Sequence, residues 1–166
     1  MANTILYLIN PENYLSGLLK IVSSLKGDVI IYVTANRSYY YLNDFFKSRG
    51  FNISKFFFID CTGTTKEEEQ EAPNCIFVNS PQNLTEISIA INELAEGVKG
   101  EKILLLDSLS TLLLYNDADV IGKFSHFFIN KLHLSGISTI ILALESDIDK
   151  DIIRRLESMS DEVNRA

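Results

Sequence analysis

Short runs of apolar residues alternate along the chain with stretches whose apolar residues recur at helical spacing. The runs are rich in β-branched residues and lack a polar face, which is typical of strands buried on both sides of a sheet. They cover residues 4–9, 28–34, 55–60, 74–80, 102–107 and 138–144. The pattern predicts an α/β fold of three layers, with a mainly parallel sheet between two layers of helices.

Helical spacing of apolar residues predicts helices between these runs. Asn10 followed by Pro11 is typical of a helix start, with a capping side chain and a proline in the first turn. Asn83, with Glu86 three residues later, resembles a capping box and predicts another helix start. Further helices are expected over about 38–48, over about 118–134 and from about residue 147, the last of them closing the chain.

Two of these stretches carry specific expectations. In the helix over about 118–134, the residues expected to face inward are Ile121, Phe124, Phe127, Phe128 and Leu132. The stretch 62–72 is predicted to be a solvated loop, because it carries the acidic run Glu67, Glu68 and Glu69.

Length, charge and cysteine content narrow the class of protein. With 166 residues the chain fits one domain, residues 1–166, and its net charge of −7 argues against a nucleic-acid partner. Its two cysteines and two histidines lack zinc-site spacing, so no metal is predicted and the cysteines are expected to be reduced thiols. Residues 4–9 are too short for a signal or membrane segment, which predicts a cytoplasmic protein without membrane contact.

Polar residues gather where the predicted strands end, which is where ligands bind in open α/β sheets. They are Asn10, Thr34, Asn36, Arg37, Asp60, Asp107, Ser108, Glu145 and Ser146. Such a crest is expected at an active site, and it is equally expected wherever parallel strands emerge into solvent.

Asp107 carries the most specific pattern, because it ends an aliphatic run and is followed by Ser108 in LLLDSLSTLL, residues 104–113. This stretch resembles the Walker B strand of the RecA superfamily, and most of all that of its KaiC-related branch. Further stretches support the resemblance: FFFIDCTG at 56–63, NSPQNLTEISIAINEL at 79–94 and GKFSHFFINKLHLSGISTIILALE at 122–145. The resemblance implies a RecA-like sheet of the P-loop NTPase type. In that sheet 138–144 lies between 4–9 and 103–107, with 28–34 on the far side of 103–107.

The chain departs from this family where relatives bind phosphate. The resemblance places a glycine-rich loop ending in Gly-Lys-Ser/Thr after the first strand, where residues 10–21 read NPENYLSGLLKI without that lysine. Pro11 removes one backbone N–H from this segment, and Glu12 places a negative charge where a phosphate would lie. Asn10, Glu12, Asp107 and Ser108 are therefore predicted to be remnants of a nucleotide site.

Two further departures concern catalysis and chain length. Relatives have acidic catalytic residues after the second strand, where residues 34–37 read Thr-Ala-Asn-Arg, so no catalytic residue and no cofactor is predicted. Relatives also continue into further strands, whereas this chain stops at SDEVNRA. The domain is expected to be C-terminally short relative to the family, either as a minimal version or as a fragment of a longer protein.

These departures favour a non-catalytic KaiC/RecA-like domain that acts as a regulatory or scaffolding module, by analogy an archaeal type of protein. The resemblance implies a protein partner, either a second copy or a related RecA/KaiC-like subunit. Candidate interface residues are Tyr39 and Tyr40, in the run Tyr39–Tyr41, and Leu113 and Tyr115, in the run Leu112–Tyr115. Both runs could equally belong to the core.

Two other functions remain open on the sequence. One is a divergent ATP-binding protein or ATPase that uses the Walker B-like Asp107. The other is a recombinase-like accessory that binds DNA, which the negative charge disfavours.

Overall fold

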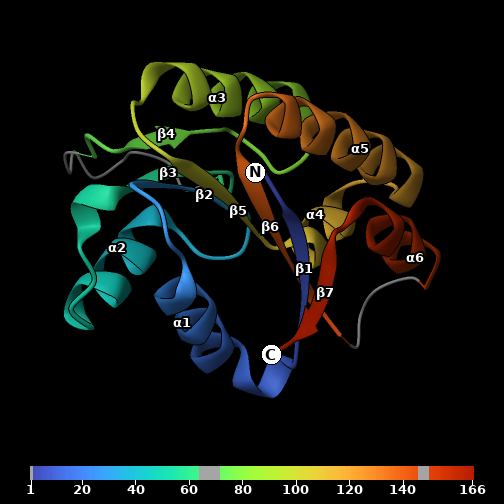
Figure 1. The fold of residues 1–166 in the computed structure, drawn as a ribbon, viewed down its shortest axis with the longest axis horizontal. Helices are drawn as coiled ribbons and strands as arrows, with labels where there is room; N and C mark the ends of the chain where they lie inside the picture. Colours follow the sequence, from blue (N-terminus) through green and yellow to red (C-terminus); the bar gives the residue numbers. More distant parts are fainter. Residues whose placement is uncertain (1, 64–71, 146–149) are drawn as a thin grey trace.

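In the computed structural model, which describes residues 2–63, 72–145 and 150–166, seven parallel strands form one sheet (Figure 1). The strands are β1 (Thr4–Ile9), β2 (Val29–Thr34), β3 (Phe56–Asp60), β4 (Cys75–Phe77), β5 (Lys102–Asp107), β6 (Ser138–Leu144) and β7 (Glu162–Arg165). Every pairing between neighbouring strands is parallel, as the unbroken apolar runs predicted.

The strand order is β4-β3-β2-β5-β6-β1-β7. β6 pairs with β1 on one side, where Thr139 lies opposite Thr4, and with β5 on the other, where Ser138 lies opposite Ile103. β2 lies on the far side of β5. The strand order predicted from the RecA-like resemblance is confirmed.

Helices cover both faces of the sheet, with α1 and α2 below it and α3 and α5 above it in Figure 1. The helices are α1 (Tyr14–Ser24), α2 (Tyr39–Ser48), α3 (Leu84–Gly97), α4 (Leu109–Tyr115), α5 (Ala118–Leu134) and α6 (Lys150–Met159), with 3₁₀ turns η1 (Pro11–Asn13) and η2 (Ile53–Lys55). In the described parts of the chain, no helix is both long enough and apolar enough to cross a membrane.

The sheet separates two apolar cores, because successive side chains of a strand point to opposite faces. In β5, Ile103 and Leu105 join the core under α1 and α2, whereas Leu104 and Leu106 join the core under α3, α4, α5 and α6. Asp107, two residues after Leu105, points to the same side of the sheet as Leu105 and therefore lies against α1.

Side chains cap the helix starts at two of the positions that the sequence indicated. Asn10 accepts a hydrogen bond from the backbone N–H of Glu12 at 3.0 Å, at the start of η1. Asn83 accepts one from the N–H of Glu86 at 3.1 Å, and its amide donates to the Glu86 carboxylate at 2.8 Å. The second bond joins two side chains, whereas a capping box would direct Glu86 to the backbone N–H of Asn83.

Two elements differ from the prediction. Residues 109–115 form α4, a short helix that the sequence pattern did not indicate. The helix α6 does not close the chain, because β7 follows it and pairs with β1, with Glu162 opposite Ile5. β7 is an edge strand of mainly polar residues, so it has no apolar run to reveal it. The predicted acidic loop at 62–72 lies largely outside the described residues.

The prediction that Phe127 faces inward is wrong. Its side chain is 62% exposed, whereas the neighbouring Phe128 is 4% exposed. Consecutive residues of a helix point about 100° apart, so both phenylalanines cannot face the same core. Ile121, Ser125, Phe128 and Leu132 form the buried stripe of α5.

These adjacent phenylalanines provide a matched test of the orientation of α5. We expect Phe128→Ala to lower the free energy of unfolding by about 3–5 kcal/mol, from lost burial and the cavity left behind. Phe127→Ala should change it by no more than about 0.5 kcal/mol. Urea denaturation of the two variants measures both effects, and equal losses would contradict the orientation described.

Candidate functional site

Asp107, the Walker B-like carboxylate, is fully buried at the end of β5. The hydroxyl of Tyr32 donates to its Oδ2 atom at 2.5 Å, and the hydroxyl of Tyr14 donates to its Oδ1 atom. Each carboxylate oxygen therefore has a hydroxyl donor from the protein itself. We call Asp107, Tyr14 and Tyr32 the tyrosine–carboxylate cluster.

The sheet and the first helix bring the cluster together. Tyr32 lies on β2 two residues before Thr34, which is the partner of Asp107 in the β2–β5 register, so Tyr32 and Asp107 share one face. Tyr14 is the first residue of α1, directly after the turn that follows β1. The Tyr32 ring packs against Phe46 and Phe58, with centroids 5.8 and 5.4 Å away, which fixes where its hydroxyl points.

Burial dominates the electrostatics of the cluster. Desolvation raises the pKa of Asp107 to about 7, because the charged form loses its hydration. Burial also raises the pKa of Tyr32, so its hydroxyl stays protonated and able to donate. The guanidinium of Arg37 lies over the rings of Tyr14 and Tyr41, 5.9 and 5.4 Å from their centroids. No ion pair among the described residues includes Asp107.

Ser108 has a structural contact of its own. It is buried, and its Oγ accepts a hydrogen bond from the backbone N–H of Thr111 at 3.2 Å, which caps α4. The peptide bond between Asp107 and Ser108 is cis. Ser110 links α4 to the end of β6, because its Oγ accepts a hydrogen bond from the backbone N–H of Leu144 at 2.8 Å.

Asn10 and Glu12 lie apart from the buried cluster, on the exposed turn between β1 and α1. The N–H of Asn10 donates to the carbonyl of Ala166 at 3.0 Å, and the N–H of Glu12 donates to the Asn10 side chain. Among the described residues, no hydrogen bond connects Asn10 or Glu12 with Asp107. The four predicted nucleotide-site remnants therefore form two separate pairs, Asn10 with Glu12 on the exposed turn and Asp107 with Ser108 in the core.

The other polar residues of the crest hold turns. Asp60 accepts hydrogen bonds from the backbone N–H of Tyr39 and of Thr62, both at 2.8 Å. The Oγ1 of Thr34 accepts from the N–H of Arg37 at 3.2 Å and donates to its carbonyl at 2.6 Å. Glu145 forms an exposed ion pair with Arg165 at 2.8 Å, and Ser146 lies outside the described residues. Thr34 and Asp60 therefore stabilise the loops and helix starts beside the strand ends.

The interface candidates divide by exposure. Tyr39 is buried and its hydroxyl donates to Asn74 Oδ1 at 2.7 Å, so its assignment to an interface is wrong. Tyr40 is half-buried and stacks on Phe77, with ring centroids 6.1 Å apart.

The second candidate run, Leu112–Tyr115, forms the C-terminal half of α4. Leu113 is half-buried against the core under α3 and α5, whereas Tyr115 is 48% exposed. Leu114, between them, is 81% exposed. The exposed apolar surface of α4 is therefore made by Leu114 and Tyr115 rather than by Leu113.

Sequence reasoning missed Tyr14 and Tyr32 as partners of Asp107. A tyrosine within an all-apolar strand is the available signal, because a buried hydroxyl needs a hydrogen-bond partner. Asp107 is the complementary acceptor at the end of the neighbouring strand.

A family profile described as "Family of unknown function (DUF7504)" matches residues 26–164. The chain belongs to this family. Among curated proteins, no sequence matches it. Membership in DUF7504 assigns no activity to the chain.

Solved structures show which fold this DUF7504 chain shares. A KaiC-like protein from Pyrococcus horikoshii OT3 matches 97% of this chain and 70% of its own, with a TM-score of 0.67 and 14% identity. A second protein from the same organism, known from a structural study, is similar over 98% of this chain and 81% of its own, with a TM-score of 0.64 and 17% identity. The flagellar accessory protein FlaH from Methanocaldococcus jannaschii matches 98% and 70%, with a TM-score of 0.63 and 12% identity. The chain therefore has a KaiC-like RecA fold.

The pKa of Asp107 predicts how stability changes with pH. Between about pH 4, where an unfolded aspartate titrates, and pH 7, the Asp107 carboxyl holds a proton in the folded protein that it has lost in the unfolded chain. The contribution of the protonated carboxyl is fully present below this window and is lost as pH rises through it. We expect wild type to lose stability relative to Asp107→Asn by up to about 1.4 kcal/mol per pH unit.

Urea denaturation at several pH values between 4 and 8 measures this difference. Asp44→Asn, on the exposed side of α2, is the control and should follow the wild-type pH dependence. Parallel curves for wild type and Asp107→Asn would contradict a buried, protonated carboxyl.

Proposed function

We propose that the chain is a non-catalytic protein-interaction module, regulatory or scaffolding in role, built on a KaiC-like RecA fold. The observation that carries this proposal is the tyrosine–carboxylate cluster, in which both oxygens of the Walker B-like Asp107 accept hydrogen bonds from buried tyrosine hydroxyls. Mg²⁺ keeps several of its waters when it binds to a protein, and it is held by one or two carboxylates together with substrate phosphates. The carboxylate therefore has to be accessible to a hydrated ion. A fully buried carboxylate with internal partners does not fit that requirement.

The segment after β1 supports the same conclusion. A phosphate at a helix start needs several free N–H groups converging on one point. Here Pro11 has no N–H, the N–H of Asn10 donates to Ala166 and that of Glu12 donates to Asn10. The exposed carboxylate of Glu12 also repels an anion at this position. Tyr14 then occupies the space in front of Asp107.

A module without chemistry acts through its surface, and α4 offers one candidate. Leu114 and Tyr115 are exposed there, and Val120 is exposed near the start of α5. We assign this surface to a protein partner, either a second copy or a related RecA/KaiC-like subunit, in the cytoplasm of an archaeal-type cell. Cys61 and Cys75 are not joined in a disulfide, which is compatible with a reducing compartment.

A divergent ATP-binding protein is the second candidate. It is favoured by the position of Asp107, which ends the central strand β5 of a fold shared with KaiC-like proteins, and of Ser108, which follows it directly. This function requires Tyr14 to leave Asp107 before a metal could approach.

Thermal unfolding with nucleotide distinguishes the two candidates. A ligand at about 100 times its Kd stabilises the native state by roughly 2.7 kcal/mol, which raises Tm by on the order of 5 °C in a domain near this size. We expect no shift with millimolar ATP and magnesium, and none with ADP. A magnesium-dependent shift that Asp107→Ala abolishes would establish the ATP-binding protein instead.

Sedimentation velocity tests the α4 surface. We expect the chain to self-associate, or to bind a related subunit, and Leu114→Ser with Tyr115→Ser to raise the Kd by about tenfold or more, equivalent to about 1.4 kcal/mol. Ile89→Ser, an exposed position on α3, is the matched control and should leave the Kd unchanged. A monomer at high concentration that also fails to bind a related subunit would count against this surface.

A further inference from the structure

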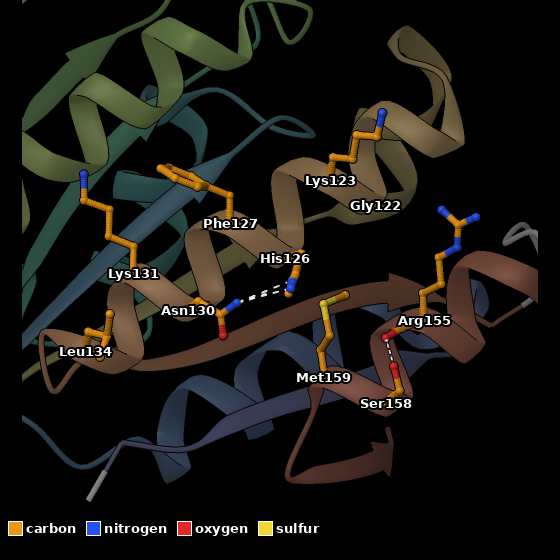
Figure 2. Close-up of a pocket in the computed structure, with 10 residues that line it drawn as sticks. All are labelled: Gly122, Lys123, His126, Phe127, Asn130, Lys131, Leu134, Arg155, Ser158 and Met159. Atoms are coloured by element: carbon orange, nitrogen blue, oxygen red, sulfur yellow. Dashed lines mark hydrogen bonds between the residues drawn. The ribbon is translucent and has the colours of Figure 1, made fainter.

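A groove of about 800 Å³ lies between α5 and α6, on the side of the sheet away from the tyrosine–carboxylate cluster (Figure 2). Its lining residues come from both helices, and they run along α5 from Gly122 to Leu134. At the helical rise this distance is about 18 Å, or roughly three turns of a helix. The groove is therefore long enough to hold a short helix lengthwise.

The groove presents apolar side chains to solvent. Phe127 and Leu134 are 62% and 88% exposed, and the half-buried Met159 faces α5 from α6 in Figure 2. At one end Gly122 lets the Arg155 side chain lie close against α5, because a Cβ there would be 3.0 Å from Nη1 of Arg155. Exposed large apolar side chains grouped in one concave site are typical of a binding surface.

Among the described residues that line this groove, every charged one is basic, although the protein carries a net charge of −7. Lys123, Lys131 and Arg155 contribute cations, and His126 lies between them. Arg155 is paired with Asp119 at 3.1 Å, but both side chains are exposed. Exposed pairs of this kind contribute little, so Arg155 can exchange its partner at small cost.

We propose that the groove binds an acidic amphipathic helix of a partner protein. Apolar residues at spacings of three and four would pack on Phe127, Leu134 and Met159, which is how helices bind in apolar grooves. Carboxylates flanking that apolar face would meet Lys123, Lys131 and Arg155 at the rim. This inference rests on the proposed function as a protein-interaction module, and it names a surface distinct from Leu114 and Tyr115.

Charge distinguishes this occupant from two others. If two copies packed groove to groove about a two-fold axis, the lysines of one groove would lie close to the lysines of the other and repel them. Each copy also carries a net charge of −7, which adds to the repulsion between copies. Nucleic acid needs a broad basic surface, whereas here a few cations border an apolar floor.

Fluorescence anisotropy with synthetic peptides tests the proposal on the full chain. The probe is a labelled peptide of about 18 residues with leucine and phenylalanine at helical spacing and glutamate at the flanking positions. One companion has lysine in place of every glutamate, and the other has the same composition with its apolar spacing scrambled. We expect the acidic amphipathic peptide to bind at least about tenfold more tightly than either companion, with affinity that falls as salt rises.

Variants at exposed positions locate the contact without threatening the fold. Lys123→Glu with Lys131→Glu should weaken binding of the acidic peptide at least about tenfold, and so should Phe127→Ser. The matched control is Lys47→Glu with Lys99→Glu, which makes the same charge change away from the groove. This control should keep the wild-type affinity.

The remaining outcomes separate this inference from the proposed function. Loss of peptide binding in Leu114→Ser, with binding kept in the lysine variant, would overturn the groove and leave the interaction module intact. Equal binding of all three peptides, no binding, or tighter binding of a single-stranded oligonucleotide would also overturn the groove. A magnesium-dependent shift with ATP would overturn the proposed function without changing the peptide result.

Discussion

The burial of one carboxylate, that of Asp107, constrains how the start of α1 packs on the sheet. Asp107 lies at the end of the central strand, where water cannot reach it, so its oxygens need donors from within the fold. Tyr14 and Tyr32 supply them, and in doing so they fix the start of α1 against β2 and β5. The start of α1 is thereby tied to the sheet by the protein's own side chains.

That constraint connects the two sides of the molecule. On the α1 and α2 side, polar groups at the strand ends mostly bind one another or a nearby backbone, and aromatic rings fill the space below them. On the opposite side, α5 turns Phe127 and Leu134 outward beside a row of cations. The exposed apolar and basic side chains thus lie on the side of the sheet opposite Asp107, which is the arrangement that the proposed interaction module requires.

More of the fold than of the site could be predicted from the sequence. Continuous apolar runs identify the central strands, and the RecA-like resemblance orders them, because both signals are local and strong. The sequence does not predict β7, because a polar edge strand has no apolar pattern. It also does not determine which side of α5 faces inward, because Phe124, Phe127 and Phe128 lie within five residues of one another. The site depends on pairs 93 and 75 residues apart along the chain, and a single sequence does not reveal such pairs.

The composition of β7 limits how this sheet can grow. An edge strand with unpaired backbone groups invites another strand to add to it, unless charged side chains make that addition unfavourable. β7 carries Glu162 and Arg165, and all of its residues except Asn164 are exposed. The opposite edge is β4, only three residues long. Strand addition is therefore disfavoured at β7 and has little length to use at β4, which leaves the outer surfaces of the helices as the more favourable place for contact with another chain.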